Sequence, residues 1–239
     1  MKKTNLRKSN GITLIALVIT IIVLLILAGV AISMLSGENG ILKKAAEAKT
    51  KTEEGQKQEE TALTSMELET YFQTENKKYK CSNGFITGIT VGTKVSEFQS
   101  ALPDGYKIEK KRFYDVNSLE WEEEKLENKE NINVSTGMIV EKDGEMIAKT
   151  VIFGDVDCDG KIMANDSSYV SIIVNMMDSK DDDDVKELIN YSTYVMYAAD
   201  VNNDGYINDL DEKEIDKVVS DISDGGLGIN QNRYISILK

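Results

Sequence analysis

The feature that most constrains this chain is a long uncharged apolar block near its start. Residues 12–35 (ITLIALVITIIVLLILAGVAISML) contain no acidic or basic side chain. As a helix, this block would be about 36 Å long, which is enough to cross the hydrocarbon core of a membrane. A cleaved secretory signal is an alternative, but its apolar region would cover only about 7–15 residues. The block therefore predicts a membrane-spanning helix.

The basic residues before this block predict its orientation. Lys2, Lys3, Arg7 and Lys8 all precede the apolar residues. Because positive charges flank the cytoplasmic ends of membrane helices, the start of the chain is expected in the cytoplasm. We therefore expect a single-pass protein of the cell membrane whose remaining domains are extracellular.

The junction Asn10-Gly11-Ile12-Thr13-Leu14-Ile15 resembles the class III leader of type IV pilins and pseudopilins. The resemblance implies that residues 1–11 are a leader and that a prepilin peptidase cuts between Gly11 and Ile12. It also implies a place in a pilus or pseudopilus, with other pilin-like subunits or the secretion machinery as partners. An uncleaved signal anchor is the alternative.

The chain departs from the pilin pattern at the fifth position after the expected cut. The family usually has a glutamate there, which pairs with the N-terminal amine of a neighbouring subunit, whereas this chain has Ala16. The departure bears on filament assembly more than on removal of the leader.

Residues 36–75 are predicted to form a helical stalk. Two glycines in Ser36–Gly40 disfavour a continuous helix at that point, at about 1 kcal/mol each. The following residues are rich in Ala, Glu, Lys and Gln, and apolar side chains recur at helical spacing only from about Ala62. This pattern predicts a solvated helix whose last turns rest on a domain, which is the architecture of pilins. The alternative is a helical stalk without a pilin-like arrangement.

Residues 76–153 predict a small β-rich head domain. Runs enriched in β-branched or alternating apolar residues predict strands at 85–91, 106–113, 137–141 and 146–153. A short helix is expected at 95–102, a hairpin turn at 142–144, and a loop or mobile helix at 115–133.

Composition argues against nucleic acid as a partner and against an enzyme. The chain has 28 Lys and Arg against 41 Asp and Glu, a formal net charge of -13, which would repel phosphates. It contains no histidine, the commonest general base and transition-metal ligand, and no catalytic group of residues is recognisable.

Two acidic segments, residues 155–166 and 200–211, align without a gap. Each has Asp or Asn at positions 1, 3 and 5, Gly at 6, Ile at 8 and Asp at 12. Oxygens at alternate positions, a glycine turn and a backbone carbonyl at position 7 are the chemistry of an EF-hand-type calcium loop. A pair of acidic glycine turns is the alternative, but two complete matches favour two calcium ions.

The predicted ligands follow from these positions. The first loop offers Asp155, Asp157, Asp159, the Lys161 carbonyl and Asp166. The second offers Asp200, Asn202, Asp204, the Tyr206 carbonyl, Asn208 and Asp211. At position 9 Met163 cannot orient a coordinating water as Asn208 can, so the second site is expected to be better ordered. Ile162 and Ile207, both at position 8, are expected to pack together.

Helices predicted at 167–177, 185–198 and 212–222 complete the acidic region. Loop-helix units that begin G/A-D-V-(D/N)-x-D-G-x-I resemble the dockerin module over residues 154–224, and the preceding T-V-I-F-G-D-V resembles the end of a β-module found before dockerins in Gram-positive surface proteins. The resemblance implies a cohesin-bearing partner that contacts loop positions 10 and 11. Here those positions hold Ala164-Asn165 and Asp209-Leu210, not the Ser-Thr type.

Two further expectations concern the cysteines and residues 225–239. Cys158, at loop position 4, is expected to point outward, where it could form a disulfide with Cys81; two free thiols are the alternative. Residues 233–239 are expected to form a last strand that returns to the head domain. The predicted fold class is α+β, with a membrane-spanning helix, a β-rich head and a dockerin-like module that has two calcium loops.

Overall fold

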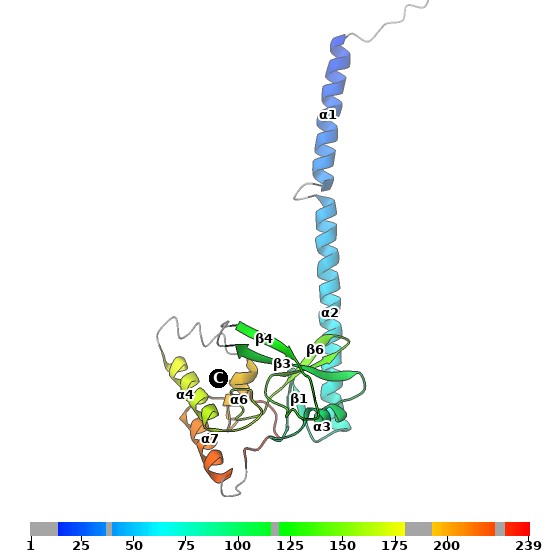
Figure 1. Ribbon diagram of the computed structural model, residues 1–239. Coiled ribbons are helices and arrows are strands. Elements are labelled where there is room, and N and C mark those ends of the chain that lie inside the picture. Colours follow the sequence, from blue (N-terminus) through cyan, green and yellow to red (C-terminus); the bar gives the residue numbers. More distant parts are fainter. Residues whose placement is uncertain (1–13, 37–39, 116–119, 180–192, 223–227) are drawn as a thin grey trace, which may run out of the picture. The chain divides into compact units, whose positions relative to one another are not determined.

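The computed structural model describes residues 14–36, 40–115, 120–179, 193–222 and 228–239 (Figure 1). The chain divides into two compact units, Met1–Glu59 and Glu60–Lys239. The predicted leader and the cleavage site between Gly11 and Ile12 lie outside the described residues.

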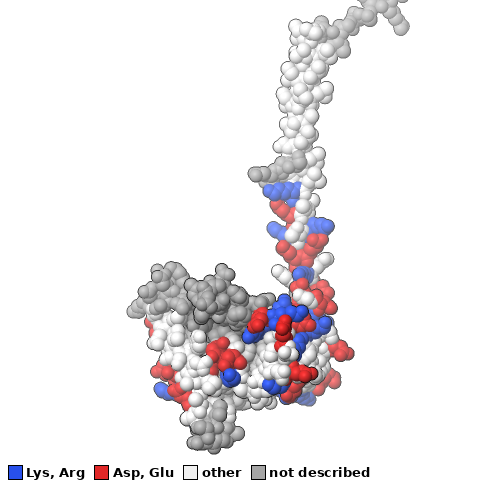
Figure 2. Space-filling view, viewed as in Figure 1, with Lys and Arg blue, Asp and Glu red and all other residues white. Residues whose placement is uncertain are grey.

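The apolar block forms helix α1, Leu14–Ser36. Its residues Leu14–Leu35 are, by length and composition, the part of the described chain that is able to cross a membrane. Figure 2 shows this helix without a charged side chain, whereas acidic and basic side chains both cover α2. The predicted spanning helix is therefore present, and it is consistent with a single-pass anchor.

Helix α2, Ile41–Thr74, follows the predicted division of its sequence. Its first half is exposed, and its first fully buried side chains are Leu68 and Phe72. The residues from about Ala62 onward therefore form an amphipathic surface that packs on the domain.

The head contains a six-stranded mixed sheet with the order β1-β2-β6-β5-β3-β4. Neighbouring strands are antiparallel except β2 and β6, which are parallel. The strands are β1 Lys80–Ser82, β2 Phe85–Thr87, β3 Tyr106–Asp115, β4 Glu120–Lys125, β5 Met138–Lys142 and β6 Glu145–Thr150. The short helix α3, Val95–Ser100, confirms the helix expected there.

Two hairpins have turns that require left-handed backbone. Asp143 and Gly144, with φ of 54° and 82°, join β5 to β6 and confirm the predicted hairpin. Asn83 and Gly84, with φ of 53° and 76°, join β1 to β2 in the same way. Asn-Gly and Asp-Gly suit this turn because both central residues adopt positive φ.

Three head predictions need correction. The expected strand 146–153 ends at Thr150, the last residue of β6. The expected strand 85–91 ends at Thr87, because the chain turns at Gly88, where a side chain would lie 3.0 Å from the Lys78 carbonyl oxygen. The expected loop or helix at 115–133 contains strand β4, which pairs with β3. Opposite charges across this pair stabilise the edge strand, as in the 3.2 Å ion pair of Lys111 and Glu124.

Three helices follow the head: α4 Ala164–Asp178, α6 Thr193–Ala199 and α7 Asp209–Ile222. Helices α4 and α7 lie side by side (Figure 1). They confirm the helices predicted after each acidic loop, and α6 is the described part of the helix expected at 185–198. Most of that helix, and the acidic run 181–184, lie outside the described residues.

Buried apolar side chains form two clusters within residues 60–239. The first lies between the sheet, α3 and the last turns of α2, and includes Phe72, Phe98 and Ile108. The second lies beneath the acidic loops and joins Ile162 and Ile207 with side chains of α4, α6 and α7. The two isoleucines therefore share one core, as their equivalent positions predicted.

The expected strand at residues 233–239 is wrong. These residues are all described, and none of them belongs to a strand. Their hydrogen bonds go mainly to the second acidic loop rather than to the sheet.

Candidate metal centre

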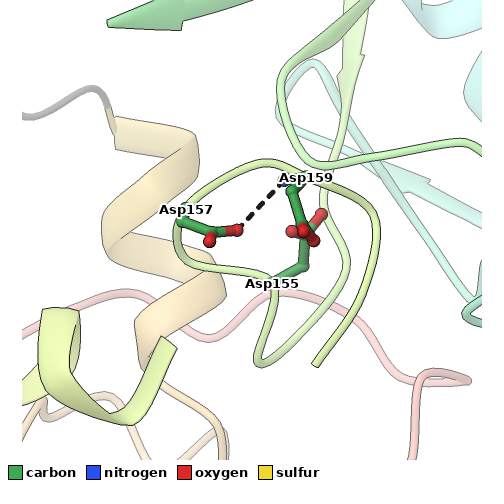
Figure 3. Close-up of side chains that lie close together, drawn as sticks. All are labelled: Asp155, Asp157 and Asp159. Carbon is green, nitrogen blue, oxygen red and sulfur yellow. Dashed lines mark hydrogen bonds between the residues drawn. The ribbon is translucent and has the colours of Figure 1, made fainter. Parts of the chain in front are cut away.

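The first acidic loop runs from the residues after β6 to the start of α4. One carboxylate oxygen from each of Asp155, Asp157 and Asp159 lies within 4.8 Å of the other two (Figure 3). Asp155 is 0% exposed, whereas Asp159 lies at the surface. This triad brings together three of the predicted ligands, and it could hold a metal ion.

Backbone N–H groups turn the three carboxylates inward. The N–H of Gly160 donates to Asp155 Oδ1 at 3.0 Å, and that of Asp159 donates to Asp157 Oδ1 at 3.1 Å. The N–H of Lys161 donates to Asp159 Oδ1 at 2.7 Å. Positive φ at Cys158 and Gly160, 63° and 82°, makes the tight curl possible.

Asp166 closes the loop from its other end but does not belong to the converging triad. Its Oδ1 accepts the N–H groups of Val156 and Asp157, at 2.8 and 3.2 Å. Its Oδ2 accepts the N–H of Met163 at 2.8 Å, at the start of α4. Asp166 therefore joins the two ends of the loop and satisfies donors at the helix N-terminus.

The second loop repeats this arrangement 45 positions later. The N–H of Gly205 donates to Asp200 Oδ2 at 3.0 Å, that of Asp204 to Asn202 Oδ1 at 2.8 Å, and that of Tyr206 to Asp204 Oδ1 at 2.9 Å. Equivalent residues therefore make equivalent bonds in the two loops.

The closing aspartate is also repeated. Asp211 accepts the N–H of Asn202 at 3.0 Å and that of Asn208 at 2.9 Å. The loops differ at position 9, where Asn208 Oδ1 accepts the N–H of Leu210 at 2.9 Å and Met163 forms no side-chain cap.

Burial of several carboxyl groups shifts their titration. Burial raises the pKa of Asp155 to about 7, and the negative charge of Asp166 adds to the rise, while N–H groups of Thr136 and Gly160 oppose it. Burial likewise raises the pKa of Asp166 and of Asp200 to about 6. It also raises the pKa of Asp157 and Asp211. A cation within the loops would relieve this cost.

The first loop is attached to the head domain by the segment before β5. The N–H of Thr136 donates to Asp155 Oδ2 at 2.7 Å. A side chain at Gly160 would lie 2.9 Å from the Val134 carbonyl oxygen, so the loop approaches this segment closely. The sequence pattern did not predict this contact, because nothing local distinguishes Thr136 from other threonines.

A second residue outside the predicted set also contacts the triad. The side-chain amide of Asn165, at loop position 11, donates to Asp157 Oδ2. The second loop has Leu210 at this position. This amide lies within the loop sequence, but position 11 is not a ligand position.

The cysteine predictions have a clear outcome. Cys81 and Cys158 are free thiols, so the disulfide between them is not formed in this structure. Cys158 does not point outward. Its thiol donates a hydrogen bond to the Val156 carbonyl oxygen, with Sγ at 3.9 Å. Cys158 is turned inward because its side chain packs against the second apolar cluster.

Comparisons of the chain with protein-family models, with curated proteins and with solved structures give no match.

Proposed function

We propose that this chain is a membrane-anchored, pilin-like surface or secretion-system protein, a minor pilin or pseudopilin, whose extracellular unit is braced by two calcium ions. The observation that carries the calcium part is the convergence of Asp155, Asp157 and Asp159 in a loop whose hydrogen-bond scheme recurs at Asp200. Three carboxylates so close together repel one another, and a divalent cation converts that repulsion into attraction.

The donor set favours calcium over transition metals. Every candidate ligand is a carboxylate, amide or carbonyl oxygen, and the chain has no histidine. Calcium prefers six to eight oxygen ligands in adaptable geometry, whereas zinc and copper prefer nitrogen and sulfur. Extracellular calcium is abundant enough for such loops to serve as permanent braces.

The pilin-like part of the proposal rests on α1 and on the residues before it. A short basic leader, Gly11 and an uninterrupted apolar helix occur together. The function of such a subunit is to anchor, and to present a folded unit outside the membrane. Calcium would stabilise that unit against unfolding in the extracellular medium.

Calcium titration of the full-length protein in detergent micelles tests the brace. We expect about two ions to bind, and we expect Asp157→Asn to weaken the first site and Asp200→Ala to abolish the tighter, second one. Asp216→Asn is the matched control, because Asp216 is an exposed carboxylate of α7 outside both loops. Absence of calcium binding to the wild-type chain would refute this part of the proposal.

Mass spectrometry of the mature N-terminus tests the pilin-like part. In cells with an active prepilin peptidase we expect the chain to begin at Ile12, and deletion of the peptidase should leave the leader attached. A chain that begins at Met1 in cells with the active enzyme would identify α1 as an uncleaved signal anchor.

A second candidate function is recruitment of a cohesin-bearing protein to the surface. The observation that favours it is the exposure of loop positions 10 and 11 in both repeats: Ala164, Asn165, Asp209 and Leu210. Calcium-dependent capture of purified cohesin domains by the full chain would support it. No capture in the presence of calcium would eliminate it and leave the structural role unaffected.

A further inference from the structure

The segment 228–239 is hydrogen-bonded to Phe153, two residues before the first loop. The Gln231 side chain forms two hydrogen bonds with the backbone of Phe153: it accepts the Phe153 N–H at 2.7 Å and donates to the Phe153 carbonyl at 2.7 Å. Gln231 is only 7% exposed, and the guanidinium of Arg233 lies 4.2 Å from the centre of the Phe153 ring. This end of the segment is therefore fixed in position.

Beyond Gln231, the segment runs along the second acidic loop. Asn203, at loop position 4, is the centre of the contact: its Nδ2 donates to the Tyr234 carbonyl at 3.1 Å, and its Oδ1 accepts the Ser236 N–H at 3.1 Å. Ser236 Oγ also donates to the Asn203 carbonyl at 2.9 Å. Arg233 donates to the Val201 carbonyl, and the Lys239 N–H donates to the Gly205 carbonyl at 2.7 Å.

The backbone of the second loop fits closely beneath this segment. A side chain at Gly205 would lie 2.8 Å from the Ile237 carbonyl oxygen. The first loop has the corresponding contact with a different segment, because a side chain at Gly160 would lie 2.9 Å from the Val134 carbonyl oxygen. Each loop is therefore covered, at the same glycine, by a segment from outside the repeat.

We propose that residues 233–239 are a strap that holds the second loop in its cation-binding shape, with Asn203 as the positioning residue. The inference rests on the proposed calcium function, and it states that the strap raises the calcium affinity of the second loop. The strap fixes the backbone of positions 2, 4 and 6, between the side chains of positions 1, 3 and 5 that would bind the ion. A loop that is already ordered loses less entropy when the ion binds.

A glycine substitution at position 4 of each loop tests the strap. Asn203 has φ of 60° and Cys158 has φ of 63°, so glycine suits the backbone at both positions. Asn203→Gly removes both side-chain bonds to the strap, whereas Cys158→Gly makes the same change in the loop that the strap does not cover. The two variants therefore share the added backbone freedom and differ in the side-chain contact that is lost, which is with the strap for Asn203 and with the second apolar cluster for Cys158.

Hydrogen exchange and calcium titration of the full-length protein in detergent provide two readouts. In the metal-free protein, Asn203→Gly should accelerate amide exchange over residues 200–206 and leave residues 155–161 unchanged. Loss of two hydrogen bonds should weaken calcium binding at the second site roughly tenfold. Cys158→Gly should leave the second loop as in the wild type in both measurements.

Unchanged exchange at residues 200–206 in Asn203→Gly would overturn the strap, and so would equal acceleration there in Cys158→Gly. A variant that ends at Asn232 gives a second test, because removal of the strap should reproduce the exchange pattern of Asn203→Gly. If the wild-type chain bound no calcium, the proposed function would fail, while the exchange measurements would still decide whether the strap orders the loop.

Discussion

The backbone N–H of Thr136 donates a 2.7 Å hydrogen bond to Oδ2 of Asp155, and this bond joins the β-rich head to the first acidic loop. Both residues are fully buried. The Thr136 hydroxyl also accepts the Ile152 N–H at 3.1 Å and donates to the Ile152 carbonyl at 3.3 Å. The first loop is therefore hydrogen-bonded to the head domain, and substitutions in the head near Thr136 should alter the stability of the loop.

Thr136→Val tests the contribution of the Thr136 hydroxyl, which bonds Ile152; the N–H that bonds Asp155 is kept in this variant. Valine has nearly the same shape, but it has no hydroxyl. The buried N–H and carbonyl of Ile152 therefore lose their hydrogen bonds to this side chain. The expected loss is about 1–3 kcal/mol of unfolding free energy, measured by chemical denaturation. Thr90→Val, at an exposed position, is the control and should change stability little. Equal losses in the two variants would contradict the role of the Thr136 hydroxyl.

Gly160→Ala tests the close approach of the first loop to the head. Alanine at positive φ costs about 1–2 kcal/mol at any site, and here its Cβ would also meet the Val134 carbonyl oxygen at 2.9 Å. Gly92→Ala separates the two effects, because Gly92 has φ of 88° and open space around its Cβ position. The Gly160 variant should be the less stable one in thermal unfolding. A larger loss at Gly92 would show that the loop does not depend on the Val134 contact.

The buried carboxyl groups predict an inverted pH dependence for the metal-free protein. The pKa of Asp155 is raised to about 7 and that of Asp200 to about 6, whereas an unfolded aspartate titrates near pH 4. The folded chain therefore binds more protons in this range, and its stability should fall as the pH rises from about 4 to about 7. Saturating calcium should reverse the trend, because the ionised carboxylates then bind the metal.

Thermal unfolding in a chelator at pH 5 and pH 7 measures this effect. Asp155→Asn should flatten the dependence, because an amide does not titrate over this range. A metal-free wild-type protein whose melting temperature rises from pH 5 to pH 7, with the same slope in the variant, would contradict the prediction.

The environments of the two thiols predict slow chemistry at both. Burial raises the pKa of Cys81 to about 12, and burial with the nearby aspartates raises the pKa of the Cys158 thiol well above its usual value. Because the thiolate is the reactive form, we expect little iodoacetamide labelling of the native protein at pH 8 and full labelling in denaturant, measured by mass spectrometry. Isolation of the chain with a Cys81–Cys158 disulfide would contradict the free thiols of this structure.

Local patterns were enough to predict much of the fold. The apolar block, the Asp143-Gly144 turn and the helices after the two acidic segments each depend on residues adjacent in sequence, and each was found where expected. Strand β4 was missed because its charged sequence is stabilised by pairing with β3, which is information from another part of the chain. The Asn83-Gly84 turn carried a recognisable hairpin signal that the strand prediction at 85–91 left unused.

The candidate site shows the same division between local and distant information. Spacing alone predicted that Asp155, Asp157 and Asp159 would converge. It could not predict the inward turn of Cys158, which follows from packing against the second apolar cluster. Nor could it predict that Thr136 and the segment 233–239 cover the loops, because those contacts join residues far apart in the sequence.

The difference between the loops at position 9 gives a final prediction. Met163 precedes α4 at the N-cap position without a side-chain cap, and it is 49% exposed, so its replacement removes little buried apolar surface. Asn208, its counterpart, accepts the N–H of Leu210 at 2.9 Å. Met163→Asn should therefore cap α4 and raise the unfolding free energy of the metal-free protein by about 0.5–2 kcal/mol.

Chemical denaturation in a chelator measures this gain. Calcium titration should also show tighter binding at the first site, because an amide at position 9 can orient a coordinating water. The reverse substitution, Asn208→Met, should lower both quantities at the second loop; unchanged stability and affinity in both variants would show that position 9 does not distinguish the two loops.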